Sequence, residues 1–186
     1  IDGITEEARK LKSCGFDGMS FRADRYLDAS TNIRQDEYGG DVINRGRFLL
    51  ELFENVKRVV GEDFLIEVNL MANSDHGHDG ELPHGYTDEE ARRFLLAIEH
   101  TIDYVVLREE LSSGYQPLVY NSKPGVHPVL AYAQALKDAG FRKPVAVNGG
   151  FTQADDMEAV LGTGACDLIA TSRTFLSDPL FIKKIT

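Results

Sequence analysis

The sequence lacks several features that would assign it to a class of protein at once. No apolar run approaches the roughly 18 residues that a membrane-spanning helix needs, although hydrophobic residues make up 42% of the chain. Residues Ile1 to Thr5 have neither the basic start nor the apolar region of a signal peptide. The chain does not begin with methionine, as expected of a fragment or a processed product. The composition is that of a soluble globular protein.

Cysteine is scarce. The chain has only two, Cys14 and Cys166, and each precedes an expected strand. We expect both to be buried, reduced thiols, because free cysteine is among the most often buried residues. Two reduced thiols fit a cytoplasmic protein better than a disulfide framework does.

Basic residues are outnumbered and scattered along the chain. Lys and Arg together number 20 against 30 Asp and Glu, which gives a formal net charge of −10. This balance argues against nucleic acid or an anionic membrane surface as the main partner. It still allows a local positive pocket for a phosphate group.

What the sequence does contain is an alternation of short apolar runs and amphipathic stretches. The runs are typical of buried strands, and the stretches between them have helical spacing. The expected strands are Phe16–Phe21, Phe64–Leu70, Asp103–Leu107, Pro144–Val147 and Asp167–Thr171. The expected helices are Thr5–Lys12, Arg47–Val60, Ala91–His100 (opened by a capping box at Thr87–Glu90), Val129–Ala139 and a last one from Thr152 to Gly162. This order predicts an α/β fold with a parallel sheet and right-handed crossovers.

The loops that follow the expected strands are longer than those that lead into them. Residues 22–46, 71–86 and 109–127 are long, polar and contain glycine. In a (β/α) barrel the loops after the strands carry the active site, so we expect the chemistry at the carboxyl ends of the strands. A complete eight-stranded barrel takes roughly 250 residues. We therefore expect residues 1–186 to form one domain, a partial TIM (β/α) barrel of about five parallel strands, with two uncovered sheet edges.

A pair of glycines at the end of one expected strand indicates a phosphate site. Gly149 and Gly150 precede a helix, so backbone N–H groups could approach an anion closely, and the helix N-terminus adds partial positive charge. Arg173, after the next strand, could bind phosphate oxygens with two N–H groups. The alternative is a tight turn at the glycines and a surface ion pair for the arginine. The residues alone leave both interpretations open.

Four motifs occur in order along the chain. They are Ala8–Gly18, Asn32–Phe48 with the pattern N-x-R-x-D-x-Y-G-G…N-R-x-R-F, Pro144–Phe151 with its glycine pair, and Gly164–Arg173 followed by Leu176–Pro179. Together they resemble the Old Yellow Enzyme family, the FMN-dependent NAD(P)H:flavin and ene reductases. The resemblance implies strands four to eight of that family's barrel, without the first three. It also implies an oxidoreductase that uses FMN, with NADH or NADPH as reductant, to transfer hydride to an activated alkene.

For the cofactor, the resemblance implies that Gly149, Gly150, Ser172 and Arg173 surround the FMN phosphate. Ser172 stands where the family commonly has glycine, so its side chain would either crowd the phosphate or donate a hydrogen bond to it. Asn69 aligns with an arginine that lies beside the flavin ring in the family. An amide can hydrogen-bond a ring carbonyl, but it cannot supply positive charge to a reduced flavin anion.

For the substrate, the resemblance indicates two candidate catalytic residues. The family's anchoring pair aligns with Phe21–Asp24 or with Arg22–Asp24, so Asp24 is one candidate. Tyr26 matches the tyrosine that protonates the substrate carbon in many members, although the segment Leu27–Thr31 after it is shorter than the family's loop. A tyrosine that only packs is the alternative for Tyr26, because a proton donor must lie within hydrogen-bond reach of the substrate.

Two other clusters have a structural interpretation that we favour. In the segment Asp75–Asp79, with His84 nearby, the residue types suit a metal ion. The segment lies in a long glycine-containing loop, where solvated polar residues are expected, and we predict no metal site there. In the Asn32–Phe48 signature, Arg45 and Arg47 next to Asp36 and Glu37 indicate ion pairs that tie the loop to the following helix.

Three functions remain to be compared. The favoured one is an oxidoreductase polypeptide acting on a small molecule, completed by a missing N-terminal segment or a second chain. The second is a non-catalytic partial barrel, a binding or assembly module that associates through its open edges. Asn69, Ser172 and the shortened loop favour the second. A phosphate-binding aldolase or isomerase is less favoured, because no lysine suited to Schiff-base chemistry stands at a strand end.

Overall fold

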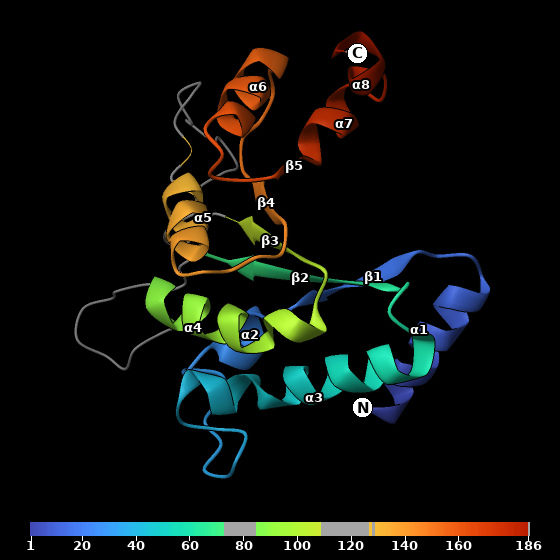
Figure 1. Ribbon diagram of the computed structural model, residues 1–186, viewed down its shortest axis with the longest axis vertical. Coiled ribbons are helices and arrows are strands. Elements are labelled where there is room, and N and C mark those ends of the chain that lie inside the picture. Colours follow the sequence, from blue (N-terminus) through green and yellow to red (C-terminus); the bar gives the residue numbers. More distant parts are fainter. Residues whose placement is uncertain (73–84, 109–126, 128, 186) are drawn as a thin grey trace.

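A computed structural model describes residues 1–72, 85–108, 127 and 129–185, and for Arg173 the backbone alone. Five parallel strands form one sheet in sequence order (Figure 1). The strands are β1 (Gly18–Arg22), β2 (Leu65–Met71), β3 (Tyr104–Arg108), β4 (Val145–Asn148) and β5 (Leu168–Ala170). The helices are α1 (Asp2–Ser13), α2 (Asp24–Leu27), α3 (Val42–Val60), α4 (Asp88–Ile98), the 3-10 helix η1 (Glu99–Thr101), α5 (Val129–Asp138), α6 (Ala154–Gly162), α7 (Arg173–Ser177) and α8 (Phe181–Ile185). The predicted α/β fold with five parallel strands is confirmed.

The strand ends differ from the prediction by one or two residues. The first strand was expected from Phe16 but begins at Gly18, since Phe16 is 58% exposed and follows Gly15, whose φ is +88°. The last strand is also shorter than expected. Its flanking Asp167 donates from its backbone N to the Val145 carbonyl, and its carboxylate accepts hydrogen bonds from Val145 N and Lys137 Nζ.

The hydrophobic core lies between one face of the sheet and the helices. Along β2, Ile66, Val68 and Leu70 are buried in this core, while Glu67 and Asn69 between them are not. Successive side chains of a strand point to opposite faces, so the two polar residues lie on the other face. Figure 1 shows α1, α3 and α4 together on one side of β1, β2 and β3. The polar face corresponds to the interior of a barrel.

Helix α3 is longer than the sequence predicted. Its expected start was Arg47, yet it begins at Val42, because Asp41 caps it by accepting a hydrogen bond from Ile43 N at 3.0 Å. Of the apolar stripe that the helical spacing predicts, Leu49, Leu52, Phe53 and Val56 are buried, and Phe48 and Val59 are partly buried against the same core. The capping box of α4 is confirmed: the side chains of Thr87 and Glu90 each accept from the other's backbone N–H.

One expectation about the cysteines is wrong. Cys166 is buried, and burial raises the pKa of its thiol. Cys14 is exposed, because it is the residue that ends α1 and lies in the turn before β1, outside the core. Both thiols are free.

Among the residues described, no helix is long and apolar enough to cross a membrane.

Candidate functional site

The carboxyl ends of β1, β2 and β3 meet in a cluster of polar side chains. Arg108, the last residue of β3, donates from Nη2 to Oδ2 of Asp24 at 2.5 Å and from Nε to Oδ1 of Asn69. Asp24 follows β1 and Asn69 belongs to β2. The structure therefore brings two of the predicted site residues together, through an arginine that the sequence analysis had not selected.

Asp24 is held firmly in this cluster. Its side chain is only 10% exposed, and Oδ1 accepts hydrogen bonds from Met71 N at 2.8 Å and from the Tyr86 hydroxyl at 2.9 Å. A buried carboxylate is stable only when it is paired and hydrogen-bonded in this way. With both oxygens engaged, Asp24 fixes the position of the Arg108 guanidinium.

A second polar group lies on the same face of the sheet, further from the strand ends. Glu67 accepts hydrogen bonds from the Ser20 hydroxyl at 2.7 Å and from the Tyr104 hydroxyl at 2.6 Å. These residues are neighbours in the strand register of β1, β2 and β3. Burial, together with the hydrogen bond to Glu67 and its negative charge, raises the pKa of Tyr104 to about 12.

At the other end of the sheet, the loops that follow β4 and β5 are joined by hydrogen bonds. The hydroxyls of Thr171 and Thr174 donate to the carbonyl of Phe151, at 3.3 Å and 2.6 Å. Gly149 is buried, and Gly150 has φ +66°, a conformation that favours glycine. The predicted phosphate glycines thus lie in a turn that is fixed against the neighbouring strand end.

The buried side chain of His127 packs against this turn. Its ring stacks on Phe151 with 4.1 Å between ring centroids and an interplanar angle of 17°. One ring nitrogen, Nδ1, lies 3.2 Å from the carbonyl oxygen of Gly149, and the other, Nε2, lies 2.8 Å from Asp156 Oδ2. The turn, β4 and the first turn of α6 are therefore linked through one imidazole.

The remaining predicted phosphate residues follow β5. Ser172 is exposed and immediately precedes α7, and its carbonyl accepts from Phe175 N and Leu176 N, both at 3.1 Å. Arg173 is the first residue of α7, and its side chain lies outside the described part. Both residues thus follow the strand next to Gly149–Gly150, at the same edge of the sheet.

Tyr26 contacts residues of the signature segment Asn32–Phe48. Its ring stacks on Phe48 at a centroid distance of 5.4 Å, and its carbonyl accepts a hydrogen bond from Asn32 Nδ2 at 3.0 Å. The side chain is partly exposed, at 38% for the residue. Among the described contacts, none joins the Tyr26 ring to Asp24, Asn69 or Arg108. Its role as a proton donor stays a prediction.

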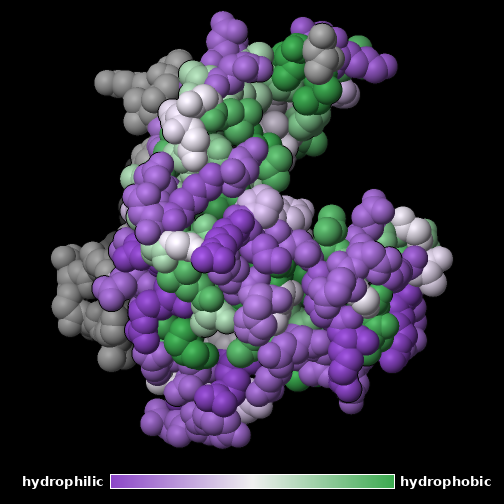
Figure 2. Space-filling view, viewed as in Figure 1, coloured by the Kyte–Doolittle hydropathy of each residue, from purple (hydrophilic) through white to green (hydrophobic). Residues whose placement is uncertain are grey.

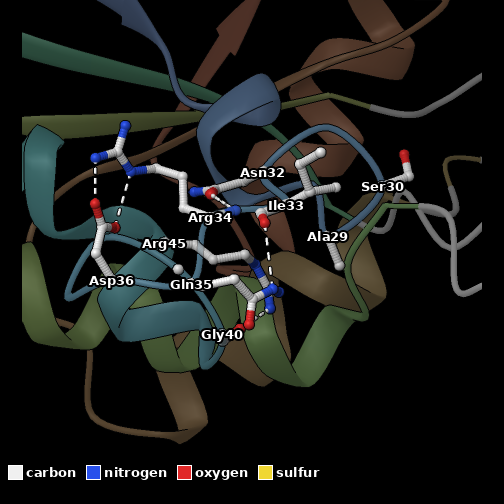
Figure 3. A pocket seen from close by; sticks show the side chains of 10 residues that line it. Ala29, Ser30, Asn32, Ile33, Arg34, Gln35, Asp36, Gly40 and Arg45 are labelled. Carbon is white, nitrogen blue, oxygen red and sulfur yellow. Dashed lines mark hydrogen bonds and ion pairs between the residues drawn. The ribbon is translucent and has the colours of Figure 1, made fainter.

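The signature loop forms a pocket of about 530 Å³, shown in Figure 3. The ion pairs expected of Arg45 and Arg47 with Asp36 and Glu37 are not among the described contacts. Asp36 pairs with Arg34, and Arg45 instead pairs with Glu90 of α4 at 2.7 Å. Arg45 also donates to the carbonyls of Leu27 and Gly40, each at 2.5 Å. The loop is tied to its helix as predicted, but chiefly through backbone carbonyls.

Two glycines of the signature lie where neighbouring atoms leave no room for a side chain. A methyl group at Gly39 would collide with the carbonyl of Arg34, and one at Gly46 would collide with the ring of Phe94. The first contact closes the loop, and the second lets α3 and α4 approach closely. The signature therefore serves the packing of the fold.

Two further residues of the site were missed by the sequence analysis. Arg108 directly follows the apolar run Val105–Leu107, so its place at a strand end was readable from the sequence. His127 gave no such signal, because its partners Gly149 and Asp156 lie 22 and 29 residues away.

The candidate metal segment Asp75–Asp79 and His84 lie outside the described residues. Within the part that the structure covers, no group of three or more His, Cys, Asp or Glu could hold a metal ion.

Comparisons with known proteins agree with this architecture. The chain is 29% identical to the metal reductase of Desulforamulus reducens over 187 residues, covering 96% of this chain and 27% of that protein. It is 29% identical to 12-oxophytodienoate reductase 2 of Arabidopsis thaliana over 189 residues, covering 96% of this chain and 47% of that protein. The chain thus spans less than half the length of either relative.

A solved structure of a 2-naphthoyl-CoA reductase bound to 2-naphthoyl-CoA superposes with a TM-score of 0.80 at 27% identity, covering 96% of this chain and 27% of that one. This likeness to a barrel flavoenzyme confirms the predicted partial (β/α) barrel. The model of the NADH:flavin oxidoreductase / NADH oxidase family matches residues 1–186. The chain belongs to the NADH:flavin oxidoreductase / NADH oxidase family, as its Old Yellow Enzyme motifs predicted.

Proposed function

We propose that the polypeptide containing this chain is an FMN-dependent oxidoreductase acting on a small molecule. The chemistry that FMN supplies is hydride transfer, from NADH or NADPH to an activated alkene. The observation that carries the proposal is the joined pair of loops after β4 and β5. Thr171 and Thr174 hold these loops together at the carbonyl of Phe151.

The residues at this joined pair of loops fit a phosphate group. Gly150, with its positive φ, brings backbone close to the strand ends without a side chain in the way. Ser172 offers a hydroxyl, and Arg173 begins the helix that follows it. The carboxylate of Asp156, near the same turn, is engaged by His127. The Asp156 carboxylate, whose negative charge would oppose a phosphate, therefore already has a partner in His127.

The cluster at β1 to β3 suits the ring of the same cofactor. Asn69 cannot supply positive charge to a reduced flavin, but Arg108 is bonded to it and carries further N–H groups beyond those used by Asp24 and Asn69. We assign Arg108 to the ring, with Asp24 and Asn69 orienting it. Tyr26 is the proposed proton donor to the substrate.

The rest of the barrel must cover the edges of the sheet. Phe16 and Leu65 beside β1, and Leu168 in β5, are 58%, 43% and 49% exposed. Figure 2 shows a wide notch on one side of the molecule, between the apolar surface of α7 and α8 and the part that carries α1. We propose that the missing strands fill this notch, supplied by an N-terminal segment or a second chain. The two free thiols fit a cytoplasmic location.

The exposed edges also favour a second candidate function, a binding or assembly module without catalysis. An uncovered strand edge pairs readily with another chain, so such a module would self-associate. In that case the joined loops would hold a phosphorylated ligand weakly or not at all.

The test uses the natural polypeptide that contains this sequence, purified without denaturant. We expect a yellow protein with stoichiometric FMN, whose visible absorbance is bleached by NADH or NADPH without oxygen. Native mass spectrometry would report both the bound FMN and the oligomeric state. A colourless, self-associated protein that takes up no added FMN would overturn the proposal and support the assembly module.

A further inference from the structure

His127 is a buried titratable residue with no role in the proposed chemistry. Its side chain is 2% exposed, and the residue lies two positions before the first residue of α5. It stacks on Phe151 and reaches Gly149 and Asp156 with its two ring nitrogens. Both ring nitrogens of this buried side chain thus have polar partners, as buried polar groups require.

Both partners of the ring are acceptors. A backbone carbonyl has no proton to give, so Nδ1 must carry the proton in its bond to Gly149. The imidazole therefore pulls the Gly149 carbonyl toward the buried side of the loop.

The direction of this carbonyl decides the direction of an N–H group. In a trans peptide the C=O of one residue and the N–H of the next point in opposite directions, and the described chain has no cis peptide bond. Because the Gly149 carbonyl faces His127, the N–H of Gly150 points away from it. Within the described residues, no hydrogen bond uses the Gly150 N–H.

The same arrangement is repeated two residues further along the chain. Thr171 and Thr174 hold the carbonyl of Phe151, so the N–H of Thr152 points away from those hydroxyls. This N–H is likewise unused among the described contacts. Backbone N–H groups left free in a glycine turn can bind an anion.

We propose that His127 is a positioning residue for the phosphate site, which presents the Gly150 N–H to the phosphate by holding the Gly149 carbonyl below the loop. The inference rests on the proposed function and adds a determinant of specificity to it. Because the Gly150 N–H binds the phosphate, His127 affects how strongly FMN is preferred over riboflavin, which lacks the phosphate. It has no effect on the flavin ring.

Two substitutions separate this role from simple packing. In His127→Asn the side-chain N–H₂ lies near the place of Nδ1 and keeps the bond to Gly149. In His127→Gln it lies near the place of Nε2 and keeps only the bond to Asp156. Both variants lose the stacking on Phe151, so they are matched in lost packing.

The measurement is the ratio of the riboflavin Kd to the FMN Kd, by fluorescence titration of the flavin-free natural polypeptide. We expect His127→Asn to keep the wild-type ratio. We expect His127→Gln to lower it by roughly tenfold to a hundredfold, the contribution of one hydrogen bond to a charged group. Riboflavin affinity should be the same in both variants.

Each outcome has a separate meaning. If wild type prefers FMN and the two variants have the same ratio, His127 is not a positioning residue and only this inference fails. If wild type does not distinguish FMN from riboflavin, the proposed phosphate site fails as well. Should His127→Gln not fold, Asp156→Asn replaces it: Asp156→Asn and His127→Asn both keep the bond to Gly149. A lowered ratio in either would then overturn the inference.

Discussion

The two ends of the sheet differ in the chemical groups that they present at the strand ends. At β1 to β3 the strand ends carry polar and charged side chains, with Arg108 bonded to Asp24 and Asn69. At β4 and β5 the available groups are backbone N–H donors, and the side chains of His127, Thr171 and Thr174 hold the carbonyls beneath them.

This difference separates two kinds of sensitivity. A site made of charged side chains depends on charge and should tolerate small changes of backbone. A site made of backbone groups depends on conformation and should tolerate changes of surface charge. In the proposed enzyme the first end faces the flavin ring and the second faces the phosphate. FMN and riboflavin therefore report on the two ends separately.

The largest effect is expected at the charged end, from Asp24→Ala. The substitution leaves Arg108 without its partner and removes the acceptor for Met71 N and the Tyr86 hydroxyl. We expect the free energy of unfolding to fall by about 3–5 kcal/mol, as for other broken buried ion pairs. Urea unfolding measures it, with Asp24→Asn as the control that keeps an acceptor. Asp24→Asn also removes the negative charge, so wild-type stability in that control would show that the ion pair is unimportant.

The next effect should appear at the backbone end. Gly150 and Gly164 both have positive φ, at +66° and +73°, but Gly164 lies in the loop that leads into β5. An alanine at either position should cost about 1–2 kcal/mol of stability, because a left-handed conformation strains a side chain. Only Gly150→Ala should also weaken FMN relative to riboflavin. Equal ratios in the two variants, measured by fluorescence titration, would remove Gly150 from the phosphate site.

Arg108→Gln tests the charged end at the level of binding. We expect roughly tenfold weaker binding of riboflavin and FMN alike, since a charge-assisted hydrogen bond to the ring is lost while the phosphate contacts remain. Arg108→Lys, which keeps the charge, should lose less. A change confined to FMN would place Arg108 at the phosphate instead of the ring.

The smallest effect concerns pH. The pKa of Tyr104 is raised to about 12 from 10.0, so the folded state holds the phenolic proton more tightly than the unfolded state does. The resulting stabilisation is complete below about pH 10 and is lost as the pH rises through about 12. The ultraviolet absorbance of tyrosinate should show a late titration that Tyr104→Phe removes. Glu67→Gln should bring that titration to lower pH; if it does not, Glu67 contributes nothing to the shift.

The sequence predicted the parts of the molecule that depend on local pattern. Apolar runs located the five strands, and Thr87 with Glu90 located the start of α4. It failed where partners are distant in the chain. Arg45 was expected to pair with nearby Asp36, yet it pairs with Glu90, 45 residues away. The same reason hid the roles of Arg108 and His127, whose partners come from other strands and loops.

A side-by-side titration of the flavin-free natural polypeptide with FMN and with riboflavin tests most directly whether β4 and β5 hold a phosphate. We predict that the wild-type protein binds FMN more tightly by at least roughly tenfold, through N–H groups and Arg173 that riboflavin cannot engage. Equal affinities for the two flavins would contradict a phosphate site at Gly149–Gly150.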